Sequence, residues 1–105
     1  MNENSLNPEL VNSFDSRQLI DYVKKLIQIV KSYPVKYENK NDFAFIAGVS
    51  HHLSSISHHK LIKDTEIGKN ISDESRFNET AGYINIGKII CELNNLLFYL
   101  ISNHR

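Results

Sequence analysis

Apolar residues recur along the chain at the alternating three- and four-residue spacing that is typical of amphipathic helices. The first such stripe consists of Leu19, Val23, Leu26, Val30 and Tyr33. We expect its helix to begin at Asp15 or Ser16 as N-cap and to end before Pro34, because the residue ahead of a proline avoids the helical region. The preceding residues Asn7-Pro8-Glu9 combine a cap, a first-turn proline and a first-turn acid, which predicts a short helix ending near Phe14.

Two further stripes predict two more long helices. The first consists of Ile46, Val49, Leu53 and Ile56, and the second of Tyr83, Ile86, Ile90, Leu93, Leu97 and Leu100. The middle helix follows a loop from Pro34 to Asn41, is capped by Asn41 or Asp42 and continues to about Ile62. Gly82 and Gly87 weaken the first turns of the last helix by up to about 1 kcal/mol each relative to alanine.

The most polar segment of the chain is Lys63 to Asn78, which carries Gly68 in its middle. The residues Ser72-Asp73-Glu74 inside it could start a helix. Three apolar residues, Ile67, Ile71 and Phe77, predict instead a loop that packs onto the core.

The three stripes can bury their apolar faces only against one another. This predicts an all-α fold, an antiparallel helical bundle of three long helices plus a short N-terminal helix. A length of 105 residues fits a single helical domain over residues 1–105. No pair of segments alternates in a way that predicts a sheet.

Charge and hydropathy argue against several classes of function. The 12 basic and 12 acidic residues cancel, which argues against a protein that holds nucleic acid through its phosphates. The richest apolar stretch, Ile84 to Ile101, is interrupted by Asn85, Lys88, Glu92, Asn94 and Asn95, so we expect no membrane span. The N-terminus has neither the basic nor the apolar region of a secretory signal, and we therefore expect a cytoplasmic protein. We expect the single cysteine, Cys91, to be a small buried or half-buried thiol.

The segment Ala47 to His59 contains thirteen residues without one Asp, Glu, Lys or Arg. Its Ser, Gly, Ala and His residues allow another backbone to come close and supply hydrogen-bond donors and acceptors. Two interpretations are open: the segment is a surface for another molecule, or the N-terminal segment or residues 63–78 cover it. In the first case the partner-binding residues are those of the segment with two acids that follow it: His51, His52, Ser54, Ser55, His58, His59, Asp64 and Glu66.

The histidines do not have the spacing of a metal site. Chelation along one helix needs ligands three or four positions apart. The same-face pairs here are His51/His58 and His52/His59, seven positions apart and therefore about 10 Å from each other. We expect neither a metal nor a cofactor.

The residues Phe45-Ile46-Ala47-Gly48-Val49-Ser50-His51-His52-Leu53 resemble the H-box of histidine kinases, which lies on the first helix of a dimeric four-helix bundle. The resemblance implies that His51 is a phosphoacceptor. The chain departs from the family pattern in three ways. His52 replaces an acidic residue, Ser54-Ser55-Ile56 replaces Arg-Thr-Pro, and we expect no ATP-binding domain.

Signatures of nucleophilic triads, phosphate-binding glycine loops and paired catalytic carboxylates are missing from the sequence, which gives no catalytic residue and predicts that the protein is not an enzyme. We expect a small non-catalytic protein-binding module. Its most concrete form is an inhibitor or immunity-type antidote that masks a toxin or an enzyme such as a nuclease. A homodimer stays open. The alternative is a histidine phosphotransfer or dimerisation domain that uses His51.

Overall fold

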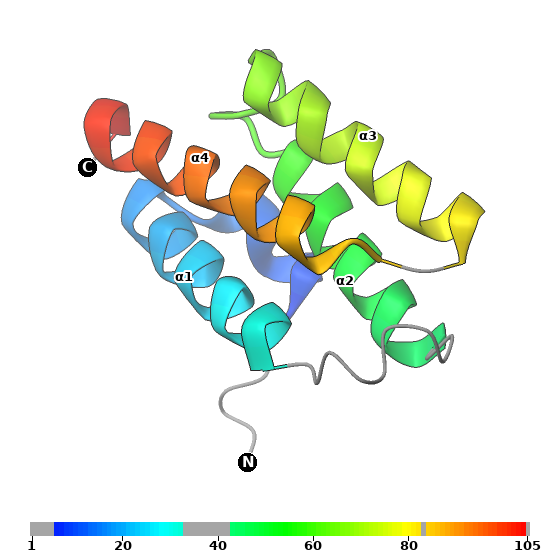
Figure 1. The fold of residues 1–105 in the computed structure, drawn as a ribbon. Helices are drawn as coiled ribbons and strands as arrows, with labels where there is room; N and C mark the ends of the chain where they lie inside the picture. Colours follow the sequence, from blue (N-terminus) through cyan, green and yellow to red (C-terminus); the bar gives the residue numbers. More distant parts are fainter. Residues whose placement is uncertain (1–5, 33–42, 83, 105) are drawn as a thin grey trace.

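The computed structural model describes residues 6–32, 43–82 and 84–104, and within these ranges the chain is helical with no strand. The elements are the 3-10 helix η2 (Pro8–Ser13) and the α-helices α1 (Ser16–Ser32), α2 (Phe43–Ser57), α3 (Glu66–Ala81) and α4 (Ile86–His104) (Figure 1). The all-α bundle predicted from the sequence is confirmed, with four long helices in place of three. The loop from Pro34 to Asn41 and the cap at Asn41 or Asp42 lie outside the described residues.

The beginning of the fold follows the predicted capping residues. The Asn7 side chain accepts a hydrogen bond from the Glu9 backbone N–H at 3.0 Å, and Phe14 ends η2. At the start of α1, Asp15 Oδ1 accepts from the Gln18 N–H at 2.9 Å, while Gln18 Oε1 accepts from the Asp15 N–H at 3.0 Å. This reciprocal pair satisfies two backbone donors that the first helical turn leaves without partners.

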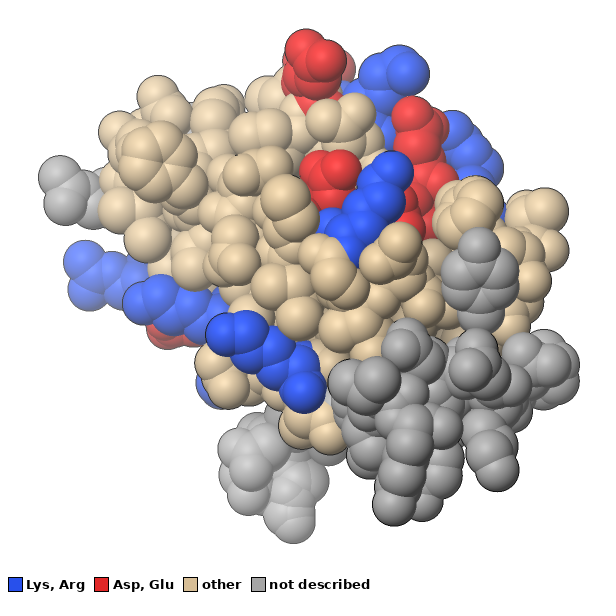
Figure 2. All heavy atoms as spheres, viewed as in Figure 1, with Lys and Arg blue, Asp and Glu red and all other residues tan. Residues whose placement is uncertain are grey.

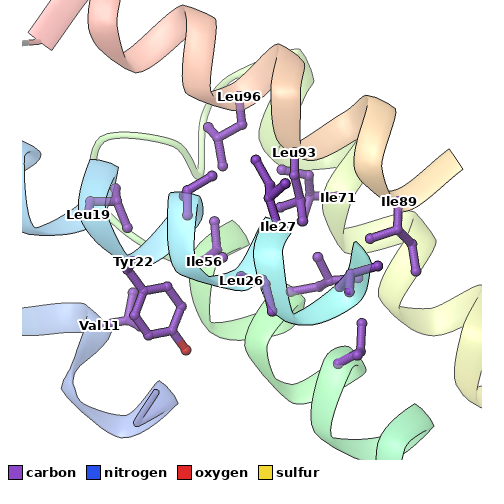
Figure 3. Packing of buried hydrophobic residues seen from close by; sticks show 14 of the residues in the cluster. Val11, Leu19, Tyr22, Leu26, Ile27, Ile56, Ile71, Ile89, Leu93 and Leu96 are labelled. Carbon is purple, nitrogen blue, oxygen red and sulfur yellow. The ribbon is translucent and has the colours of Figure 1, made fainter. Parts of the chain in front are cut away.

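The apolar stripes form one core. α1 packs against α4, whereas α2 packs against α3 and η2. Residues from every element meet between these layers, among them Val11 of η2, Leu26 of α1, Ile56 of α2, Ile71 of α3 and Leu93 of α4 (Figure 3). Each of these five side chains is almost completely removed from solvent, so burial of apolar surface holds the helices together.

The prediction of a loop from Lys63 to Asn78 is wrong, because most of this segment forms α3. Thr65 caps this helix by accepting the Gly68 N–H on its hydroxyl at 2.9 Å, and Gly82 ends it with a φ of 78° in the left-handed region. The buried face of α3 contains the polar residues Glu74, Ser75 and Asn78 beside Ile71. A helix whose inner face is largely polar shows no apolar stripe in its sequence.

The boundaries of α2 and α4 compare as follows with the predicted ones. α2 ends at Ser57 rather than near Ile62: the His58 N–H is shared between the Ser54 and Ser55 carbonyls at 3.2 and 3.3 Å, and the His59 N–H bonds to the Ile56 carbonyl three residues back at 3.0 Å. α4 begins at Ile86, where Asn85 Oδ1 accepts the Lys88 N–H at 3.0 Å, and Tyr83 of the predicted stripe lies outside the described residues. On α4, Cys91 is exposed, so the expectation of a buried or half-buried thiol is wrong.

The inner face of α3 contains buried polar atoms. The Ser75 hydroxyl donates to the Ser50 carbonyl of α2 at 2.8 Å, and Glu74, only 4% exposed, has one carboxylate oxygen 3.5 Å from Lys88 Nζ of α4. The Ser50 hydroxyl, the second Glu74 oxygen and both amide atoms of Asn78 are buried without a hydrogen-bond partner in the described part of the chain. A buried polar atom without a partner costs about 1 to 3 kcal/mol, so α3 is held less tightly than it would be through an apolar face of the same size.

Candidate functional site

The four histidines that follow Ser50 sort into one exposed pair and one inward pair. His51 and His58 are exposed, whereas His52 is half-buried and His59 is completely buried. The side with His52 and His59 is therefore covered by the protein's own residues, while the side with His51 and His58 is open to solvent and stays the predicted surface for a partner.

His52 is bound by α1. The hydroxyl of Tyr22 donates to His52 Nδ1, and the two rings meet edge to face with centroids 5.6 Å apart. Burial lowers the pKa of His52 from 6.5 to about 4, with a smaller contribution from the charge of neighbouring His51. Burial also raises the pKa of the Tyr22 phenol above its usual value, so both groups are neutral around pH 7.

His59 holds the junction between η2 and α1. Its Nε2–H donates to the Phe14 carbonyl at 2.9 Å, and its Nδ1 accepts the Leu61 N–H at 3.1 Å. One ring nitrogen must donate and the other must accept, which assigns the neutral tautomer with the proton on Nε2. His52 and His59 thus serve the protein's own packing.

The exposed pair lines a hollow between η2 and α2, which we call the histidine hollow. It has a volume of about 380 Å³ and is lined by Pro8, Glu9, Asn12, His51, Ser54, Ser55 and His58. The His58 ring is fixed there by its Nδ1–H, which donates to the Ser54 carbonyl at 2.7 Å. This bond leaves Nε2 of His58 as the hydrogen-bond acceptor of the ring.

A second hollow, the charged hollow, begins at the same His58 and continues along α3. Its volume is about 490 Å³, and its charged lining consists of Lys63, Asp64, Lys69, Asp73 and Arg76. Asp73 is paired with Arg76 at 2.8 Å and with Lys69 at 3.5 Å. His58 therefore stands where a polar depression with one acidic residue, Glu9, meets a depression of mixed charge.

The structure brings five of the eight predicted site residues onto these two depressions. His51, Ser54 and Ser55 line the histidine hollow, Asp64 lines the charged hollow, and His58 lines both. Glu66 is exposed in the first turn of α3 and lines neither hollow.

Sequence reasoning missed the contribution of η2 to the histidine hollow, because Glu9 and Asn12 lie some forty residues from His51 in the chain. It also did not predict that the basic residues of the polar segment lie together beside Asp64. Their polar segment was interpreted as a loop, and a loop does not place Lys69 and Arg76 on one helix face.

Comparisons with protein-family models, curated proteins and solved structures found no match. Within the described ranges, no three His, Cys, Asp or Glu side chains are grouped so that they could hold a metal ion. No described helix combines the length and the apolar character that crossing a membrane requires.

Proposed function

We propose that the protein is a small non-catalytic protein-binding module of the cytoplasm, and most concretely an inhibitor or immunity-type antidote that covers the active site of a toxin or another enzyme. The observation that carries this proposal is the pair of adjoining hollows that share His58. A partner loop lying along both would meet hydroxyl and imidazole groups first and charged groups next. Contacts in this order would fix the orientation of the bound loop and would favour one partner over others.

Some of the acidic residues on this surface favour a basic partner, whereas others are already paired with basic residues of the protein. Asp73 is neutralised by Lys69 and Arg76, so it adds little to the field outside the protein. Glu9, Asp64 and Glu66 form no ion pair among the described residues, and they supply the acidic groups that a basic active-site cleft would meet.

The test begins with two tagged versions of the protein, the wild type and the triple variant His51→Ala, His58→Ala, Asp64→Ala. Both are used to capture partners from cells that make the protein, and the affinity of the captured partner is then measured with purified components. We expect the triple variant to lose at least about tenfold in affinity, since it removes hydrogen bonds and one charge from the contact.

A matched control replaces three exposed residues of α1, Arg17, Lys24 and Gln28, with alanine, and this variant should bind as the wild type does. The activity of the captured partner is measured with and without the protein. Unchanged affinity of the triple variant rules out this surface, and a partner whose activity is unaffected when bound rules out the inhibitor.

The second candidate is histidine phosphotransfer through His51. It is favoured by the exposure of His51 and by the presence of Glu9 in the same hollow, where a carboxylate could assist proton transfer. The protein would be incubated with a phosphorylated response-regulator domain. Acid-labile phosphate on the wild type that is lost in His51→Gln would support this candidate, and its absence from the wild type would exclude it.

A further inference from the structure

The rings of the two exposed histidines, His51 and His58, differ in how they are held. His58 Nδ1 lies 2.7 Å from the Ser54 carbonyl, one turn back in the chain, whereas His51 forms no hydrogen bond with a described residue. A carbonyl oxygen only accepts, so the neutral His58 ring has its proton on Nδ1 and a lone pair on Nε2. The ring lines both hollows, and Nε2 is therefore a nucleophile held at their junction.

The charged hollow brings three basic side chains into the surroundings of this ring. Lys63 precedes α3, and Lys69 and Arg76 lie on it. Two acidic side chains, Asp64 and Asp73, complete the charged lining, so basic groups outnumber acidic ones. Figure 2 shows how closely acidic and basic side chains lie together over α3. The hollow as a whole favours an anionic ligand over a cationic one, because its net charge is positive.

Asp73 holds two of these basic groups in position. Its Oδ1 accepts a hydrogen bond from Arg76 Nη2 at 2.8 Å, and its Oδ2 lies 3.5 Å from Lys69 Nζ. A guanidinium presents a fork of N–H donors and an ammonium presents several, so both groups keep donors for the oxygens of an anion. Arginine and lysine together are the groups that stabilise a phosphoryl group during its transfer, since their charges offset the charge on its oxygens.

We propose that His58 accepts a phosphoryl group on Nε2 in the charged hollow, and that the donor is an acyl phosphate. The lone pair of Nε2 attacks the phosphorus atom, and the bond from phosphorus to the acyl oxygen breaks. The electron pair of that bond leaves with the carboxylate, a stable anion that needs no general acid. The Nδ1 proton stays on the ring, and its hydrogen bond to the Ser54 carbonyl stabilises the positive charge that the ring gains.

The surroundings of the two exposed histidines favour His58 over His51 as the acceptor. His51 lines only the histidine hollow, whose described lining contains Glu9 and neither Lys nor Arg. A carboxylate repels the negative oxygens of a phosphoryl group, whereas the basic groups of the charged hollow attract them. The proposal does not rest on the inhibitor function, and it assigns the phosphoryl group to a histidine other than that of the second candidate.

The first experiment incubates the full chain near neutral pH with acetyl phosphate, a small acyl phosphate, and follows acid-labile phosphate on the protein over time. The matched variants are His58→Gln and His51→Gln. We expect His58→Gln to lower the rate at least about tenfold and His51→Gln to leave it unchanged. Phosphorus NMR of the wild type should show the Nε2 isomer of phosphohistidine, because Nδ1 is bonded to the Ser54 carbonyl.

The second experiment tests the basic groups of the charged hollow. Arg76→Gln removes one charge and should lower the rate at least about fivefold, because its N–H donors no longer offset the charge on the phosphoryl oxygens. The matched control Arg17→Gln removes the same charge from an exposed position of α1 and should leave the rate unchanged. Circular dichroism verifies that all variants fold.

A parallel series uses a response-regulator domain that carries an aspartyl phosphate, the protein form of the same acyl phosphate chemistry. The donor that transfers faster identifies the source of the phosphoryl group. The proposal is overturned if neither donor phosphorylates the wild type, or if His58→Gln is phosphorylated as fast as the wild type. Phosphate on Nδ1 in place of Nε2, or a rate that Arg76→Gln leaves unchanged, also overturns it. The inhibitor function stands or fails separately, because it is tested by capture and affinity.

Discussion

Lowering the pH should destabilise the fold through His52. The imidazole accepts a hydrogen bond from Tyr22 on Nδ1, and burial lowers its pKa to about 4 from the 6.5 of an exposed histidine. The unfolded chain therefore binds a proton at a higher pH than the folded chain does. Stability from this group is fully present above about pH 6.5 and is lost as the pH falls toward 4, because proton uptake then favours the unfolded state.

The magnitude follows from the two pKa values. A difference of one pKa unit corresponds to about 1.4 kcal/mol, so a change from 6.5 to about 4 sets an upper limit of about 3.5 kcal/mol. His52 is only half-buried, and solvent screens part of this energy. We expect a loss of about 1 to 2 kcal/mol between about pH 7.5 and about pH 4.5.

Urea unfolding of the wild type and of His52→Gln at both pH values measures the effect, because carboxylates that also titrate contribute equally to the two proteins. His51→Ala should show a smaller loss than the wild type, since the charge of His51 is one cause of the lowered pKa of His52. If wild type and His52→Gln lose the same free energy between the two pH values, His52 does not titrate as this environment requires.

Three further predictions concern single residues. Gly68→Ala should lower the free energy of unfolding by at least about 2 kcal/mol, because a Cβ there would lie 2.2 Å from the Ile62 carbonyl oxygen. Gly48→Ala should raise it by about 0.5 to 1 kcal/mol, because there is open space around this position of α2. Urea unfolding measures both changes. Thr65→Ala removes the cap of α3 and should lower the unfolding free energy by about 1 kcal/mol in the same assay. Because burial raises the pKa of Tyr22, the wild type should lose stability as the pH rises above about 10, and Tyr22→Phe should lose less, as thermal unfolding will show.

The parts of the fold that sequence reasoning predicted correctly are those with an apolar inner face. Leu19, Val23 and Leu26 of α1 and Leu93 of α4 are all buried, as their spacing predicted. α3 escaped detection because its inner face presents Glu74, Ser75 and Asn78 beside a single buried large apolar residue, Ile71. No periodicity in hydropathy reveals that the Ser75 hydroxyl will bind the Ser50 carbonyl.

The sequence indicates which histidines of the candidate site share a side of the chain. The seven-residue spacing pairs His51 with His58 and His52 with His59, and the exposures divide along the same line. The apolar stripe of this helix also leaves His51 facing away from the core, and His51 is exposed in the structure. The contact of His52 with Tyr22 could not be predicted, because Tyr22 lies on another helix.

The unpartnered atoms of Ser50, Glu74 and Asn78 give the bundle a preferred place to open. Water that reaches the inner face of α3 would hydrate these unpartnered groups, which lowers the free energy needed to separate α3 from the bundle relative to separation of two apolar faces. Amide protons in the second half of α3 should therefore exchange with deuterium sooner than those at the contact of α1 with α4. A chain with this property comes apart by releasing one helix while the remaining helices stay folded.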